Sequence, residues 1–214
     1  EPRESHRPER QASRAPSGTE NEKVIKPETE PGKGELKMGE VVKVISELAG
    51  RDTVVVTDVG QHQMAVARYY RFTDSNTLVT SGGMGTMGFG LPAAMGAATG
   101  TTDRPVIAFI GDGGFQMTVQ ELGTIMQYRI PVKIVLLNNS FLGMVRQWQE
   151  MFYKKQYSAT CLGPSGRGNN EKIKDRPDAP YLPDFVKLAE AHGALGLRAK
   201  TRAAVVPMLV KAFE

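Results

Sequence analysis

Two stretches decide the fold: VIAFIGDGG at Val106–Gly114 and VKIVLLNN at Val132–Asn139. Each begins with a nearly continuous apolar run of strand length, which is typical of strands buried on both faces of a sheet. The residues between them, from about 115 to 128, have a helical pattern. A strand, a helix and a second strand in this order predict a parallel pair.

The same alternation extends in both directions along the chain. Further strands are expected at 53–57, 77–80 and 195–199, and further helices at 38–48, 61–71, from about 90, from about 143, at 185–192 and at 204–213. The sequence therefore predicts an α/β fold, a doubly wound and mostly parallel sheet with helices on both faces.

Two segments differ from this pattern. Residues 1–35 contain four aliphatic residues, no aromatic residue and five prolines, so they bury too little apolar surface to fold and are expected to form a disordered linker or tail. Residues 36–214 are expected to form the domain. Within it, the segment at about 154–182 is rich in glycine, proline and charge, and predicts a mobile loop.

Composition excludes several classes of protein. The 214 residues carry a net charge of +4 and one cysteine, which excludes a disulfide framework and a cysteine-built zinc site. No apolar run has the length of a membrane span, and no clustered basic and aromatic pattern indicates nucleic-acid binding. These features favour a soluble cytoplasmic protein that binds neither membrane nor nucleic acid.

Unusual sequence follows each of four predicted strands. The four turns are Asp58–His62, Ser81–Gly88, Gly111–Gly114 and Asn138–Asn139, and the carboxyl ends of parallel strands share one edge of the sheet. Ten glycines fall between Ser81 and Gly114. Glycines allow positive φ and close backbone approach, and the helix starts that follow them present N–H groups to an anion. The pattern favours a phosphate ligand, with tight packing of turns as the alternative.

A dinucleotide site is one reading of these glycines. Gly83–Gly88 fits G-x-G-x-x-G, but the fingerprint also needs an acidic residue near the end of the next strand. Asp103 precedes that strand, and Asp112 lies too far along the chain and between glycines. A magnesium–diphosphate clamp fits better, because Asp112 and Asn139 offer oxygen ligands at two strand ends. Asp112 as a helix N-cap remains the alternative.

The spacing of these motifs resembles a known cofactor signature. Gly111-Asp-Gly, 24 further residues and then Asn138-Asn139 resemble the signature of thiamine diphosphate enzymes. Together with the segments 60–64, 81–88, 111–119 and 143–149, the chain from about Met38 onward resembles the catalytic subunit of acetolactate synthases. The fold implied is the thiamine diphosphate-binding fold.

The resemblance implies a set of site residues. Gln61 and His62 would contact the diphosphate, Met87 would hold the two cofactor rings in a bent form, and Trp148 would lie at the second-substrate pocket. Asp112, Asn139 and the carbonyl of Phe141 would ligate magnesium. The complete cofactor set comprises Gly60, Gln61, His62, Gly85, Met87, Gly111, Asp112, Gly113, Gly114, Asn139, Phe141, Leu142, Gly143, Met144 and Val145. From the residues alone, Met87 could instead be a core residue, Trp148 a core or interface residue, and His62 a structural cap.

The resemblance also implies a reaction and partners. Acetolactate synthases condense pyruvate with pyruvate or 2-ketobutyrate with loss of CO2, in the synthesis of isoleucine and valine. In this family the activating glutamate lies in an N-terminal pyrimidine-binding domain, supplied across a homodimer interface. A middle domain carries FAD, and a small regulatory subunit is a further candidate partner. We therefore expect an inactive segment of a larger subunit. A half-subunit of a split enzyme and a noncatalytic dinucleotide-binding domain are the alternatives.

Overall fold

The computed structural model describes residues 21–163 and 182–214. At its centre is a parallel sheet of four strands in the order β2-β1-β3-β4. The strands are β1 at Val54–Thr57, β2 at Leu78–Thr80, β3 at Val106–Gly111 and β4 at Val132–Leu137. The predicted parallel sheet is confirmed, and all four glycine-rich or polar turns follow strands at the same edge.

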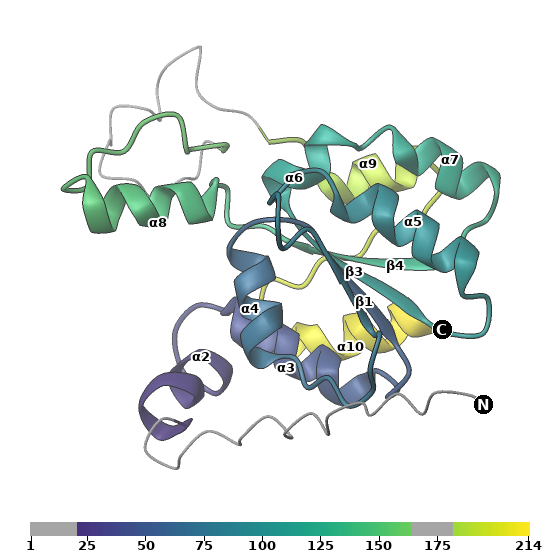
Figure 1. Ribbon diagram of the computed structural model, residues 1–214, viewed down its shortest axis with the longest axis horizontal. Helices are drawn as coiled ribbons and strands as arrows, with labels where there is room; N and C mark the ends of the chain where they lie inside the picture. Colours follow the sequence, from purple (N-terminus) through teal and green to yellow (C-terminus); the bar gives the residue numbers. More distant parts are fainter. Residues whose placement is uncertain (1–20, 164–181) are drawn as a thin grey trace, which may run out of the picture.

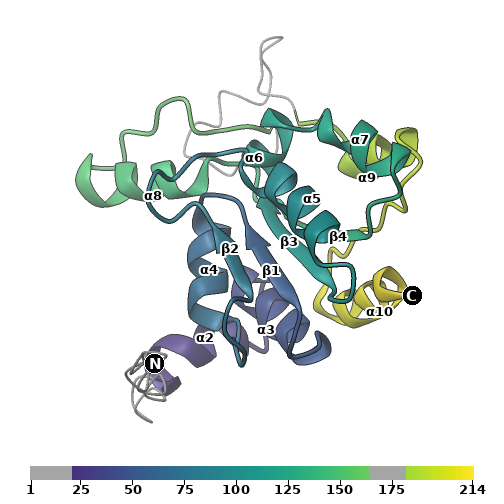
Figure 2. The ribbon, with the colours of Figure 1, turned by 45° about the vertical axis from the view of Figure 1, so that its right-hand side comes forward.

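Helices cover both faces of the sheet (Figure 1). On one face lie α3, α4 and α10, at Met38–Leu48, Gln61–Tyr69 and Arg202–Phe213. On the other face lie α5, α7 and α9, at Gly90–Gly100, Glu121–Gln127 and Phe185–Ala191. The short α6 at Asp112–Met117 starts directly after β3. Helix α8 at Gly143–Phe152 projects away from the sheet (Figure 2).

Two apolar clusters form the core, one on each face of the sheet. Alternate residues of a strand enter opposite clusters: Ile107 and Phe109 pack with α3 and α4, whereas Val106, Ala108 and Ile110 pack with α5 and α7. Every residue of β1 and β3 is buried. This explains why both strands read as continuous apolar runs rather than as alternating ones.

The strand order creates a topological switch point. The helix after β1, α4, covers one face, whereas the helices after β3 lie on the other. The chain therefore leaves the carboxyl ends of β1 and β3 in opposite directions. In open parallel sheets, ligands bind in the crevice that this divergence leaves.

Two predicted elements differ in the structure. The expected strand at 195–199 is wrong, because these residues form no ladder and Gly196 packs instead against the backbone of Val186 in α9. The single helix expected at 115–128 is divided into α6 and α7. The division falls near Thr118, whose hydroxyl donates to the carbonyl of Gly88 at 3.1 Å, a bond that draws the chain toward the glycine loop.

The N-terminal segment is structured where the structure describes it. Residues Asn21–Ile25 form a π-helical turn, η1, and Lys26–Thr29 form α2, where the sequence analysis expected linker. Residues 1–20 lie outside the described residues, as does most of the loop expected at 154–182. The composition argument missed α2 because polar contacts to the domain, rather than apolar burial, hold it.

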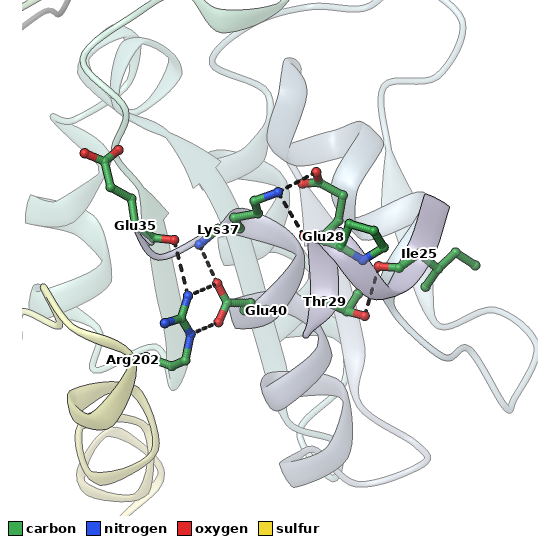
Figure 3. A network of polar contacts seen from close by, with 8 residues as sticks. Ile25, Glu28, Thr29, Glu35, Lys37, Glu40 and Arg202 are labelled. Carbon is green, nitrogen blue, oxygen red and sulfur yellow. Dashed lines mark hydrogen bonds and ion pairs between the residues drawn. The ribbon is translucent and has the colours of Figure 1, made fainter. Parts of the chain in front are cut away.

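Those polar contacts join distant parts of the chain (Figure 3). Lys37 Nζ donates to the carboxylate of Glu28 at 2.8 Å, and the backbone N–H of Lys37 donates to Glu40 at 2.9 Å. Arg202, at the start of α10, binds both carboxylate oxygens of Glu40 and also the carbonyl of Glu35. The Glu40 residue is only 6% exposed, so this pair fixes α10 and the N-terminal segment to the start of α3.

Across the two described ranges, no helix combines the length and the apolarity that a membrane span requires.

Candidate functional site

A cavity of about 240 Å³ opens at the switch point, beyond the carboxyl ends of β1, β3 and β4. Every residue that the sequence analysis assigned to the cofactor lines it. Met38, Val59 and Leu137 also line it and were not predicted. Trp148 is not among the lining residues; it lies on α8 and is 59% exposed. The structure thus gathers the predicted cofactor set around one cavity and leaves the predicted substrate residue at its periphery.

His62 lies at the base of this cavity, between two glycines. A β-carbon at Gly60 or Gly111 would lie 2.9 Å from the Cε1 atom of the ring, so the imidazole occupies the room that both glycines leave. The residue is 5% exposed, and burial lowers its pKa to about 4, against the opposing effect of a hydrogen bond with the Asp58 backbone. The ring is therefore neutral near pH 7.

The Nε2 atom of His62 is buried and lacks a hydrogen-bond partner among the residues that the structure describes. A buried polar atom without a partner costs free energy, and such atoms mark sites where another group binds. Two other side-chain atoms in the described residues, Thr53 Oγ1 and Asp58 Oδ2, also lack a partner, but His62 lines the cavity, so its Nε2 favours a polar ligand there.

Asp112 lies at the junction of β3 and α6 and is 2% exposed. One carboxylate oxygen accepts the backbone N–H of Gly113 at 2.9 Å, and the other accepts that of Ser140 at 2.6 Å. Burial raises the pKa of Asp112 above its ordinary value, and these backbone donors oppose the rise. Each oxygen keeps a further lone pair, so the carboxylate can also bind a cation.

The loop after β4 holds a chain of amides. Asn139 Oδ1 accepts the N–H of Phe141 at 3.0 Å, and Asn139 Nδ2 donates to Gln61 Oε1 at 3.3 Å. Gln61 Nε2 donates in turn to Gln147 Oε1 on α8 at 3.2 Å. Ser140, which lies between Asn139 and Phe141 in the chain, has a φ of 64°, a sparsely populated conformation for a residue with a side chain. The loop is thus held by hydrogen bonds to Asp112 at the start of α6 and to Gln61 in α4.

The glycines of the site serve mainly to make room. Of those between Ser81 and Gly114, only Gly85 and Gly88 have positive φ, at 63° and 86°. Gly113 matters through its missing side chain: a β-carbon there would lie 2.7 Å from Leu142 Cδ2 and 3.7 Å from the terminal carbon of Met87. Met87 therefore reaches over the start of α6, across the floor of the cavity.

Asp58 is a residue whose role the sequence analysis missed. It is 0% exposed, and its Oδ1 accepts the N–H of Gly90 at the start of α5 at 3.0 Å. Its Oδ2 has no partner within the described ranges and lies where a side chain at Gly114 would be. Burial raises its pKa. The sequence placed Asp58 after a strand, but nothing in it showed that Gly90, 32 residues away, binds it.

Comparison with known proteins places this architecture in a family. The family model described as "Thiamine pyrophosphate enzyme, C-terminal TPP binding domain" matches residues 58–214, which include the whole cavity apart from Met38. The chain belongs to this family. The domain is therefore a thiamine diphosphate-binding one, which confirms the predicted fold and, of the predicted cofactors, thiamine diphosphate.

Curated relatives of the domain include acetolactate synthases. The chain is 47% identical over 164 residues to an acetolactate synthase large subunit of Lactococcus lactis, covering 77% of this chain and 26% of that protein. An acetolactate synthase of Mycobacterium bovis is 45% identical over 84% of the chain and 27% of the relative. Isozyme 3 of Escherichia coli is 42% identical over 76% and 25%. The chain spans about a quarter of these relatives' length.

Proposed function

We propose that this chain is the diphosphate- and Mg²⁺-binding domain of an acetolactate synthase large subunit. The parent enzyme would condense pyruvate with pyruvate or 2-ketobutyrate and release CO2. The observation that carries the proposal is the convergence of the predicted cofactor residues on one cavity at the switch point. In that cavity, His62 Nε2 is buried and has no partner among the described residues.

The residues fit a magnesium–diphosphate group. Mg²⁺ prefers a few protein oxygens together with phosphate oxygens and water. The Asp112 carboxylate, the Asn139 amide oxygen and the Phe141 carbonyl supply that set, and hydrogen bonds hold the loop that carries the last two. The Gln61 amide offers a donor for the diphosphate, whereas the neutral His62 ring would contact it through Nε2 as an acceptor, for a bridging water or a protonated phosphate oxygen. When bound, the thiamine group supplies the carbanion chemistry, while the protein supplies placement and field.

The remaining residues would enclose the cofactor and the substrate. Met87 would support the flat rings from below, since a large adaptable side chain fits an irregular apolar gap. Gly143, Met144 and Val145, in the first turn of α8, would close the cavity from above. Trp148, one turn further along α8, would contact the second keto acid and favour 2-ketobutyrate over pyruvate.

Further domains complete the proposed enzyme. The activating glutamate would come from an N-terminal pyrimidine-binding domain of a second subunit, and FAD would lie in a middle domain. A small regulatory subunit and a cytoplasmic location belong to the same proposal. The 214 residues alone would then bind the diphosphate end of the cofactor but form no acetolactate.

The proposal is tested by calorimetric titration of thiamine diphosphate into the protein with and without Mg²⁺. We expect binding that depends on Mg²⁺ and is lost in Asp112→Ala, and acetolactate formation by the full-length subunit only. NAD binding without Mg²⁺ that survives Asp112→Ala would replace the proposal with a dinucleotide-binding domain. A co-purifying second chain with its own glutamate would indicate a split enzyme.

A further inference from the structure

Arg146 contacts two aromatic rings at the edge of the candidate site. Its guanidinium carbon is 4.4 Å from the ring centroid of Phe141, which precedes α8, and 3.6 Å from that of Tyr157, which follows α8. Both distances fall within the range of a cation–π interaction. The planar guanidinium can stack on aromatic faces, as a lysine ammonium cannot.

The backbone around Phe141 is held on both sides. An antiparallel bridge pairs Phe141 with Cys161. The N–H of Leu142 donates to the carbonyl of Thr160 at 2.9 Å, and the N–H of Leu162 donates to that of Ser140 at 2.9 Å. Residues 140–142 and 160–162 therefore form a short two-stranded clamp next to the cavity.

The clamp holds the backbone next to Phe141, whereas the side chain of Phe141 contacts Arg146. Its ring lies against the guanidinium, while its backbone follows the strained Ser140 and carries the carbonyl proposed as a metal ligand. Strained backbone persists only where its surroundings over-determine it. The same guanidinium also contacts the ring of Tyr157, so Arg146 connects the two ends of the α8 segment.

We propose that Arg146 is a positioning residue for the metal site: in contact with the rings of both Phe141 and Tyr157, it fixes the direction of the Phe141 carbonyl toward the cation. The inference rests on the proposed function, because it needs Mg²⁺ at Asp112 and Asn139. In this proposal, the ring of Phe141 orients the backbone carbonyl of the same residue through its contact with Arg146.

The test measures metal binding rather than turnover. In the full-length subunit with thiamine diphosphate, Mn²⁺ replaces Mg²⁺, and the electron paramagnetic resonance signal of free Mn²⁺ reports half-saturation. Arg146→Met keeps the length of the side chain and removes the cation, and we expect it to raise half-saturation about tenfold, as for other outer-shell partners of metal ligands. Phe141→Leu, which removes the ring, is expected to do the same, and the double variant to add little further.

Conservative variants separate positioning from general stability. Tyr157→Phe keeps the ring and is expected to keep the wild-type half-saturation, whereas Arg146→Lys is expected to fall between wild type and Arg146→Met. Arg51→Met, at an exposed arginine paired with Asp74, is the matched control and should leave metal binding unchanged. If Arg146→Met does not fold, Tyr157→Leu tests the same contacts from the ring of Tyr157.

The outcomes distinguish the two proposals. Wild-type protein that takes up no Mn²⁺ with the cofactor would overturn the proposed function and this inference together. Wild type that binds Mn²⁺ while Arg146→Met binds it equally well, or merely melts at a lower temperature, would overturn this inference alone.

Discussion

The carboxylate of Asp112, at the start of α6 directly after β3, accepts the backbone N–H of Ser140, after β4, at 2.6 Å. This bond joins two chain segments that are neighbours only because β3 and β4 run parallel and in register from Val106–Val132 to Gly111–Leu137. Charge-assisted bonds of this kind are shorter and stronger than neutral ones. The sheet therefore determines the relative position of the carboxylate and the asparagine loop before any ligand enters.

The room left by Gly113 is expected to be essential for the cofactor. In Gly113→Ala, the added methyl group meets Leu142 Cδ2 at 2.7 Å, the mobile end of a side chain, so the domain should fold. The methyl group and the displaced leucine would fill the cavity floor, and overpacking of this kind predicts a loss of cofactor affinity of about tenfold or more. Calorimetric titration measures it.

Gly123→Ala is the matched control for that variant. Gly123 lies within α7, and a β-carbon there meets nothing within 4 Å. Alanine should stabilise the helix by about 1 kcal/mol and leave affinity unchanged. Equal affinities for the two alanine variants would contradict the role given to Gly113.

The buried His62 predicts a pH dependence of stability in the absence of ligand. Its pKa is about 4 in the folded protein against an ordinary 6.5, so between these values the unfolded chain binds the extra proton. Stability should therefore fall as pH decreases from 6.5 toward 4, by roughly 3 kcal/mol from this group, with no further loss below.

His62→Gln isolates this contribution, because glutamine does not titrate. Urea denaturation at pH 7 and pH 4.5 measures the free energy of unfolding of both proteins. Carboxylates elsewhere titrate alike in the two, so the wild type should lose more stability than the variant. The same loss in both would show that His62 is not buried as a neutral ring.

Asp58 is expected to be a stability residue of the site. Asp58→Ala leaves the N–H of Gly90 without its acceptor and should lower the free energy of unfolding by about 1–3 kcal/mol. Asp58→Asn should lose less, since its amide oxygen still accepts that N–H. Asp74→Ala, at an exposed carboxylate, should change stability by no more than about 0.5 kcal/mol. Calorimetric melting measures these differences. If Asp58→Asn is less stable than Asp58→Ala, the assignment is refuted.

The pair between Glu40 and Arg202 is expected to stabilise the domain without affecting the cofactor. Glu40→Ala removes the acceptor for the N–H of Lys37 at the start of α3, which predicts a loss of about 1 kcal/mol. Hydrogen bonding by Arg202 lowers the pKa of Glu40, so the stabilisation present at neutral pH should be lost as pH falls through that lowered pKa.

A double-variant cycle with Arg202→Met tests this pair. The two substitutions should be non-additive in thermal melts, because either one breaks the same contact. Cofactor affinity should stay constant in all four proteins. Additive melting shifts would mean that the pair contributes no coupling energy.

Much of the fold could be predicted because strands and their turns carry local signals. The apolar runs at Val54–Thr57 and Val106–Gly111 indicated buried parallel strands, and parallel strands bring their carboxyl ends to one edge. The prediction of a strand at 195–199 was wrong, because a short apolar run carries no information about whether the edge strand of a sheet pairs with it. Pairing is a tertiary property.

The site could be predicted as a set of positions but not as a set of contacts. The glycine pattern marked the turns, yet it could not show which glycines need positive φ and which make room for His62 or Met87. The contacts of Asp58 and Arg146 could not be predicted for the same reason. Their partners lie across turns of the fold, and no spacing rule connects them.

The floor of the cavity has a consequence for how such a domain can diversify. His62 fills the room at Gly60 and Gly111, and Leu142 and Met87 fill that at Gly113, so almost any replacement of these glycines is a large step rather than a gradual one. The later turns of helix α8, where Trp148, Met151 and Phe152 are exposed, tolerate exchange far more easily. New substrate preferences are therefore expected to arise by mutation in these exposed turns of α8, while the glycines of the cavity floor are inherited unchanged.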